Sequence, residues 1–117
     1  MPFPAKEAKE TDVAPKTVMV SSAKDLEEGR ARVFQLEDLR IALCRVGARI
    51  YAVEDLCTHD EGPLGEGRLD GFAIECPRHG ARFDVRDGKV LRMPAAFPVR
   101  TFPAHEKDGK VYVEIDE

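Results

Sequence analysis

The 117-residue sequence has no apolar run approaching the ~20 residues that a membrane-spanning helix needs. Its first residues lack both the hydrophobic core of a signal peptide and the Arg-rich, acid-poor composition of a transit peptide. An excess of positive charge is also missing, since the formal net charge is -4, which argues against nucleic-acid or anionic-membrane partners. We therefore expect a single-domain cytoplasmic protein that is a monomer and binds neither nucleic acid nor membrane.

Cysteine is scarce, with three residues in the whole chain. An odd number of thiols in a short chain makes a poor disulfide framework. Cys44 lies in the apolar run of residues 41–44, where we expect it to act as a small buried hydrophobic residue. Cys57 and Cys76 remain for chemistry.

Long amphipathic helices are also missing, and short strand-sized runs separated by turns predict an antiparallel all-β domain. Pro-containing residues 1–16 are expected to form a flexible lead, and residues 17–117 the domain. Residues 23–29 read as a polar turn, and Asp-Gly pairs predict hairpin turns at residues 87–88 and 108–109. Predicted strands lie around Val18 and Val20 and at residues 30–35, 39–45, 49–53, 82–85, 89–91 and 110–115.

Two short stretches carry the candidate ligands. Cys57-Thr58-His59 and Cys76-Pro77-Arg78-His79 each supply one thiol and one imidazole, with sixteen residues between His59 and Cys76. A structural Cys2His2 zinc site usually pairs Cys with Cys and His with His, about two to five residues apart. The alternation seen here favours a two-iron centre in which both Cys hold one iron and both His the other. A zinc site and a Cys–His nucleophile pair are the alternatives, although no third orienting group accompanies such a pair.

The two stretches closely resemble the signature of the Rieske [2Fe–2S] family. Residues 60–67 resemble the first cluster loop of that family, residues 80–84 the second, and residues 93–96 the proline-containing third loop. The resemblance implies the Rieske fold, an antiparallel β-sandwich or barrel base carrying a small cluster-binding subdomain at about residues 55–85.

The resemblance also implies one [2Fe–2S] cluster and its ligands. Cys57 and Cys76 would ligate the inner iron through thiolates, and His59 and His79 the outer iron, near the surface. Two thiolates leave the oxidised cluster formally neutral, whereas four would leave two negative charges, and this difference raises the reduction potential. The expected cluster environment comprises Gly62, Pro63, Leu64, Arg78, Gly80, Ala81, Phe83 and Pro94.

Four positions depart from the high-potential respiratory members of the family. Gly62 and Arg78 stand where those members carry an additional Cys in each loop, so their disulfide cannot form here. Ala81 and Phe83 stand where those members carry a Ser and a Tyr that donate hydrogen bonds to sulfur. Fewer donors stabilise the reduced cluster less, and we expect a low reduction potential.

A low-potential member of this size resembles the Rieske-type ferredoxins of bacterial oxygenase systems used in aromatic hydrocarbon catabolism. The resemblance implies an electron carrier and not an enzyme. It would take single electrons from an NAD(P)H-dependent flavin reductase and pass them to a terminal oxygenase. The small Rieske-like subunit of an assimilatory nitrite reductase is the alternative within the same fold, and a zinc-binding structural module is the alternative outside it.

Partners are expected to dock at the tip formed by His59 and His79. The predicted apolar rim of this tip comprises Pro63, Leu64 and Pro94. The mixed charges around it belong to Asp60, Glu61, Glu66, Arg68, Arg78 and Arg82. The third histidine, His105, is expected to be an ordinary surface residue.

Overall fold

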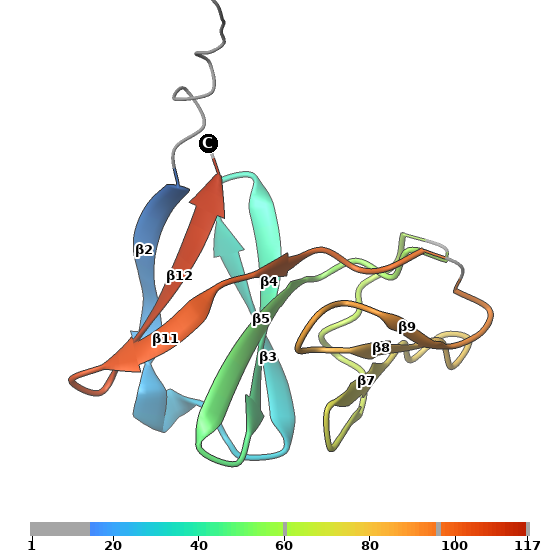
Figure 1. The fold of residues 1–117 in the computed structure, drawn as a ribbon, viewed down its shortest axis with the longest axis horizontal. Helices are drawn as coiled ribbons and strands as arrows, with labels where there is room; N and C mark the ends of the chain where they lie inside the picture. The colour runs from blue at the N-terminus through green and yellow to red at the C-terminus, as the bar shows by residue number, and fades with distance from the viewer. Residues whose placement is uncertain (1–14, 60, 96, 117) are drawn as a thin grey trace, which may run out of the picture.

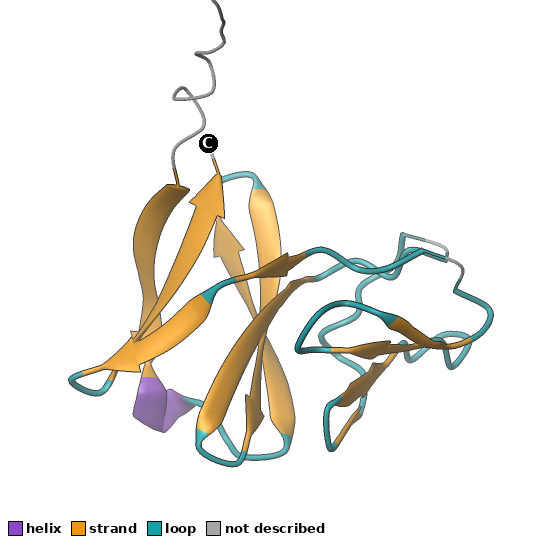
Figure 2. Cartoon of the chain, in the orientation of Figure 1, coloured by secondary structure: helices purple, strands orange, loops and turns teal. Residues whose placement is uncertain are grey.

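The computed structural model describes residues 15–59, 61–95 and 97–116, and nearly all of their regular structure is β (Figure 2). A single turn of 3-10 helix, Ala23–Asp25, is the exception, so no helix in these ranges is long and apolar enough to cross a membrane. The strands are β2 (Pro15–Ser22), β3 (Arg30–Leu36), β4 (Leu39–Val46), β5 (Arg49–Glu54), β6 (Leu69–Asp70), β7 (Ala73–Glu75), β8 (Arg82–Asp84), β9 (Val90–Arg92), β10 (Thr101–Phe102), β11 (Ala104–Lys107) and β12 (Lys110–Asp116).

Two antiparallel sheets form the base of the molecule, at the left of Figure 1. One has the strand order β10-β5-β4-β3 and the other β11-β12-β2. Along β12, Val111, Val113 and Ile115 are buried while Tyr112 and Glu114 are partly exposed, as their alternation predicts. These inward residues pack in one core with the residues of β4 and β5 that face them.

A third sheet, β6-β7-β8-β9, forms the smaller subdomain at the right of Figure 1. It is inserted between β5 and β10, which pair with each other in the base. The sheet continues to Arg92, beyond the limit at about residue 85 that the sequence had suggested. The chain therefore enters the subdomain from β5 and leaves it into β10, and these two strands are neighbours in one sheet.

Strand β4 joins the base to the subdomain because it is buried on both faces. Ile41 and Leu43 belong to the base core, whereas Ala42 and Cys44 belong to a second core that contains Cys57 and Cys76. Successive side chains of a strand point to opposite faces, so the unbroken apolar run of residues 41–44 serves both cores. Both faces of this strand are therefore buried.

The all-β antiparallel prediction is confirmed, and each predicted strand is present within two residues of its expected ends. The prediction of a polar turn at residues 23–29 was wrong in one respect, since Ala23 and Leu26 are buried in the base core. The strands that sequence patterning missed have two to four residues, too few to show a period: β6, β7, β10 and β11. Of the predicted lead, residues 1–14 lie outside the described ranges, and β2 begins at Pro15.

Candidate metal centre

The first Cys–His stretch is a closed loop at the end of β5. The Cys57 N–H donates to the Gly62 carbonyl at 2.8 Å, and the Glu61 N–H donates back to the Cys57 carbonyl at 2.6 Å. Glu61 has a φ of 63°, in the left-handed region. These bonds hold His59 at the outer turn of the loop and fix Cys57 at its base.

The second stretch, after β7, repeats the same hydrogen-bond offsets. The Cys76 N–H donates to the Ala81 carbonyl at 2.7 Å, and the Gly80 N–H donates to the Cys76 carbonyl at 3.0 Å. Gly80, with a φ of 79°, occupies the left-handed position that Glu61 takes in the first loop. Two segments separated in sequence thus hold their Cys residues on equivalent backbone frames, while His59 lies two residues after its Cys and His79 three.

A third loop with these offsets shows that the backbone alone does not define a metal site. The Asp84 N–H donates to the Lys89 carbonyl at 2.9 Å, and the Gly88 N–H to the Asp84 carbonyl at 2.7 Å. This loop carries no Cys or His. The chemistry of the first two loops therefore comes from their side chains.

The four candidate ligands divide sharply by exposure. Cys57 and Cys76 are 0% and 1% exposed, while His59 and His79 are exposed. The two imidazoles lie edge to face, with their ring centroids 5.1 Å apart. The structure thus brings the two histidines together at the surface and places both thiols in the core beneath.

This donor set fits a two-iron cluster. Thiolates hold iron within clusters and imidazole is a usual iron ligand, so each iron can take one like pair of donors. Within the described ranges, no three His, Cys, Asp or Glu side chains form a group that could hold a single metal ion. A divided, binuclear centre requires only a pair of donors at each ion.

The residues expected around the centre fall into a buried and an exposed set. Leu64, Ala81 and Phe83 are fully buried, and the expectation that Leu64 forms part of an exposed rim was therefore wrong. Leu64 faces the core because the backbone of its loop turns inward there. The remaining members are buried Gly62, partly exposed Gly80, and exposed Pro63, Arg78 and Pro94.

The segment beyond β9 lies against the first loop. The Thr58 hydroxyl donates to the Phe97 carbonyl at 2.6 Å, and the Met93–Pro94 peptide bond in this segment is cis. Met93 is 81% exposed and Phe97 68% exposed. Neither side chain was among the predicted rim residues, although Met93 begins the proline-containing loop and Phe97 follows it, which was a usable signal.

Arg82 and Arg68 are engaged in ion pairs, so they contribute less docking charge than expected. The Arg82 Nη2 lies 2.8 Å from a Glu75 carboxylate oxygen, and its Nη1 lies 3.4 Å from Asp70. Arg68 lies 3.9 Å from the same Glu75 oxygen. Exposed Glu61 and Glu66 remain available for partner contacts, and Asp60 lies outside the described residues.

Cys44 and His105 take no part in the two loops. Burial raises the pKa of the Cys44 thiol to about 12, which keeps it neutral and unreactive, as its predicted core role requires. His105 is exposed on β11 of the base, where its ring stacks on Tyr112 at a centroid distance of 5.4 Å.

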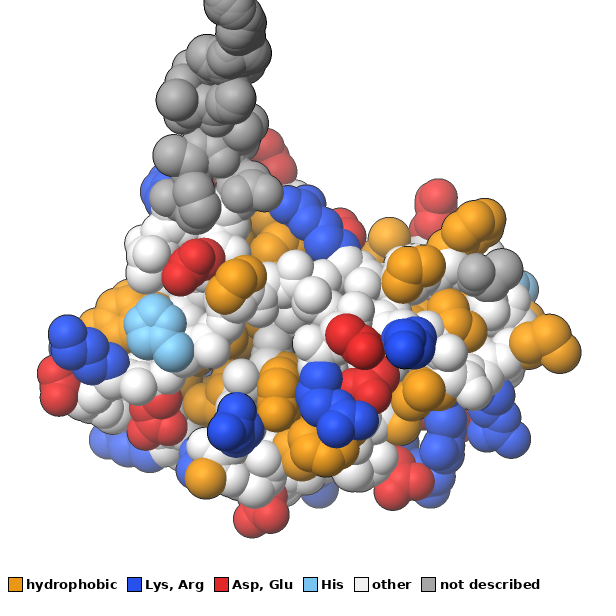
Figure 3. Space-filling view, in the orientation of Figure 1, with side chains coloured by type: hydrophobic (Ala, Val, Ile, Leu, Met, Phe, Trp, Pro, Cys, Tyr) orange, Lys and Arg blue, Asp and Glu red, His pale blue; other side chains and the backbone are white. Residues whose placement is uncertain are grey.

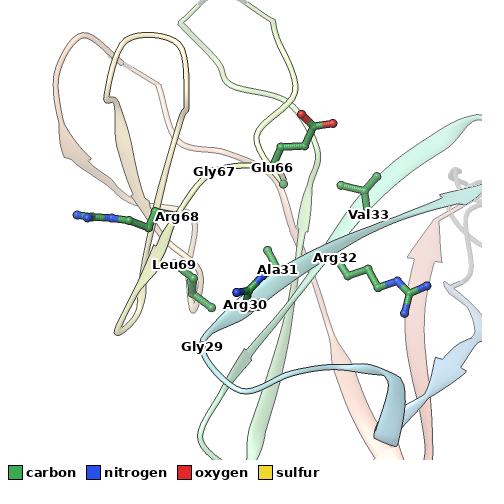
Figure 4. A pocket seen from close by; sticks show the side chains of 10 residues that line it. Gly29, Arg30, Ala31, Arg32, Val33, Glu66, Gly67, Arg68 and Leu69 are labelled. Atoms are coloured by element: carbon green, nitrogen blue, oxygen red, sulfur yellow. The ribbon is translucent and has the colours of Figure 1, made fainter.

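A groove of about 720 Å³ lies between residues 29–33 and residues 65–69 (Figure 4). None of the four candidate ligands lines it. Three arginines line the groove, and the side chains of Arg32 and Arg68 point away from each other in this view.

Comparisons with known proteins identify relatives along most of the chain. Residues 16–103 match the Rieske [2Fe-2S] domain family. The chain is 42% identical over 95 residues to ferredoxin CarAc of Metapseudomonas resinovorans, covering 80% of this chain and 89% of that protein. It is 37% identical over 101 residues to the 3-phenylpropionate/cinnamic acid dioxygenase ferredoxin subunit of Photorhabdus laumondii, covering 86% and 95% respectively.

The fold is similar to that of a ferredoxin solved together with its partner. The complex of reduced oxygenase and oxidized ferredoxin in carbazole 1,9a-dioxygenase contains a chain that superposes with a TM-score of 0.78 at 40% identity. The match covers 83% of the present chain and 91% of that one.

Proposed function

The chain belongs to the Rieske [2Fe-2S] domain family, and from that premise we propose that it carries single electrons to a terminal oxygenase acting on an aromatic substrate. The observation that carries the proposal is the opposite exposure of the two ligand pairs, with buried Cys57 and Cys76 beneath surface His59 and His79. When bound, the cluster supplies one-electron chemistry. The exposed imidazoles give a partner a short route to it, while the buried thiols are shielded from water.

The proposed ligands follow from this arrangement. Cys57 and Cys76 would hold one iron as thiolates, and His59 and His79 would hold the other through their imidazoles. Both loops are closed by backbone hydrogen bonds within the subdomain, and these bonds fix the backbone at both Cys residues. Preorganised ligands lose little conformational freedom on binding, which favours retention of the cluster.

A low reduction potential is part of the proposal. Ala81 and Phe83 are fully buried beside the second loop, and neither side chain has a hydroxyl to donate to sulfur. Gly62 and Arg78 cannot form the disulfide of the respiratory members. Both features reduce the stabilisation of added negative charge and favour donation to an oxygenase.

The partners are proposed from the named relatives. Those relatives are ferredoxin subunits of dioxygenase systems, and one is solved in complex with its oxygenase. An NAD(P)H-dependent flavin reductase is proposed as the electron source. Because the NAD(P)H pool is cytoplasmic, we place the carrier there, acting as a monomer that binds each partner transiently.

The docking surface is proposed at the end of the subdomain where apolar side chains gather (Figure 3). Met93 and Phe97 expose most of their side chains in the segment bonded to the first loop through Thr58. Large exposed apolar residues on a small protein mark interaction sites. Together with the two histidines they form a surface that combines partner binding with access to the cluster.

Replacing His59 or His79 with Ala should abolish the native cluster, because the outer iron loses half of its protein ligands. Iron content and the visible and EPR spectra of the purified protein report the loss. His105→Ala is the matched control and should leave all three unchanged, since His105 lies on the base sheet. A wild-type spectrum in either ligand variant would contradict the assignment.

The double variant Ala81→Ser with Phe83→Tyr should raise the reduction potential, because each hydroxyl can donate to a sulfur that becomes more negative on reduction. A differential hydrogen-bond energy of ~1 kcal/mol corresponds to roughly 40 mV for a one-electron couple. Protein-film voltammetry measures the shift. An unchanged or lower potential with an intact cluster would defeat the argument about hydroxyl donors.

Truncating Phe97 to Ala should slow electron transfer to an oxygenase about tenfold, since loss of an aromatic anchor typically costs 1–2 kcal/mol of binding. Stopped-flow oxidation of the reduced protein by the oxygenase component of carbazole 1,9a-dioxygenase provides the rate. Met19→Ala removes a comparably exposed side chain, 52% exposed on β2 of the base, and should not change it. Equal rates for wild type and Phe97→Ala would remove Phe97 from the docking surface.

A further inference from the structure

Asp55 is a buried carboxylate that closes the first ligand loop from below. Its side chain is fully shielded from solvent, and one oxygen, Oδ1, accepts hydrogen bonds from the Leu64 N–H at 2.8 Å and the Gly65 N–H at 2.5 Å. The loop that carries Cys57 and His59 is therefore tied at its far end to the residue that precedes it. Neither the strand pattern nor the ligand motif had singled out this aspartate.

The second oxygen of Asp55 faces a guanidinium from the base. Oδ2 accepts from the Arg40 Nε at 3.1 Å and from its Nη2 at 2.9 Å, and the Asp55 N–H donates to the Arg40 carbonyl at 2.8 Å. Arg40 lies on β4, the strand shared by both cores. The carboxylate thus joins the ligand loop to the base through four side-chain hydrogen bonds.

Close packing fixes the backbone of Gly65 next to the Asp55 carboxylate. A Cβ at Gly65 would lie 3.0 Å from the Ala42 Cβ and 3.1 Å from the Asp55 Oδ1, and closer still to the Val33 side chain. Only glycine lets the loop backbone approach the carboxylate this closely. The negative charge is therefore held at a fixed place beneath the loop.

Satisfying two backbone amides does not by itself require a charge. The side-chain oxygen of Asn could accept both N–H groups, whereas burying a carboxylate carries an additional desolvation cost. The side chain of Arg40 is 53% exposed and solvent screens its charge, so it compensates the fully buried carboxylate incompletely. The pair therefore leaves a net negative charge beside the loop that carries Cys57 and His59.

We propose that the ion pair between the buried Asp55 carboxylate and the partly exposed Arg40 guanidinium sets the reduction potential as well as the position of the first ligand loop. The proposal rests on the assignment of Cys57 and His59 as ligands. Asp55 is two residues from Cys57, so their Cα atoms lie within about 7 Å. Reduction adds one negative charge, which the Asp55 carboxylate opposes and the Arg40 guanidinium favours. Asp55 and Arg40 are positioning residues, since neither is a ligand.

The two partners should shift the potential in opposite directions. Asp55→Asn keeps the acceptor for Leu64 and Gly65 but removes the charge, so the potential should move to a more positive value. Arg40→Gln leaves the carboxylate less compensated, so the potential should become more negative, by a smaller amount because Arg40 is partly exposed. A purely structural role would predict cluster loss in both variants, without opposite shifts.

Protein-film voltammetry of the loaded variants at neutral pH, with iron content and EPR recorded on the same samples, tests the proposal. Glu37→Gln and Lys16→Gln are the charge-matched controls, because that exposed pair, with N and O 2.8 Å apart, lies outside the ligand loops. Neither control should shift the potential.

Shifts of the same sign in Asp55→Asn and Arg40→Gln, or no shift with an intact cluster, would overturn the proposal. Should Asp55→Asn fail to hold its cluster, Arg40→Gln decides alone, a negative shift supporting the proposal and any other result overturning it. Failure of the ligand assignment would appear separately, as a retained cluster in His59→Ala or His79→Ala.

Discussion

The pair of backbone hydrogen bonds that closes each Cys–His loop is the constraint on which the candidate site depends. In both loops the Cys N–H and carbonyl are bonded across the loop, so the Cys side chain enters the core and the His side chain turns outward. The hydrogen-bond offsets are the same in the two loops and place both Cys side chains in the core, although His59 follows its Cys by two residues and His79 by three. A third loop, beginning at Asp84, has the same pair of hydrogen bonds. The first two loops differ from it in carrying Cys and His, and these side chains make them a candidate metal site.

The rest of the molecule supports the loops from beneath. Strand β4 contributes one face to the base core and the other to the core that contains both thiols, so loop position is coupled to the base sheet. The hydrogen bonds of Asp55 to Leu64 and Gly65 add a polar attachment to this apolar one. A rigid support of this kind suits electron transfer, because a centre that moves little between oxidation states has little to reorganise.

The sequence predicted what depends on local pattern and missed what depends on distant contacts. The types and the spacing of the four candidate ligands indicate a metal site: Cys57, His59, Cys76 and His79. The alternation of apolar and polar residues along β12 predicts which of its faces is buried. Leu64 was misplaced because its burial depends on the turn made at Asp55, a contact between loop amides and a carboxylate that no periodicity encodes. Phe97 could be recognised from the sequence as a large apolar residue next to the proline-containing loop, but its place beside the first loop depends on the bond to Thr58, a residue distant in sequence. Short strands such as β6 have too few residues to show a pattern in the sequence, and they form because they pair with a neighbouring strand.

Division of the ligands between two irons is the central claim, and pulsed EPR tests it most directly. The reduced protein is prepared with 15N-labelled histidine in an otherwise 14N background, and nitrogen couplings to the electron spin are counted. Ligation by His59 and His79 predicts two strongly coupled histidine nitrogens, with His105 contributing none because it lies on the base sheet. A spectrum with one such nitrogen or with none would contradict the assignment of both imidazoles to the outer iron.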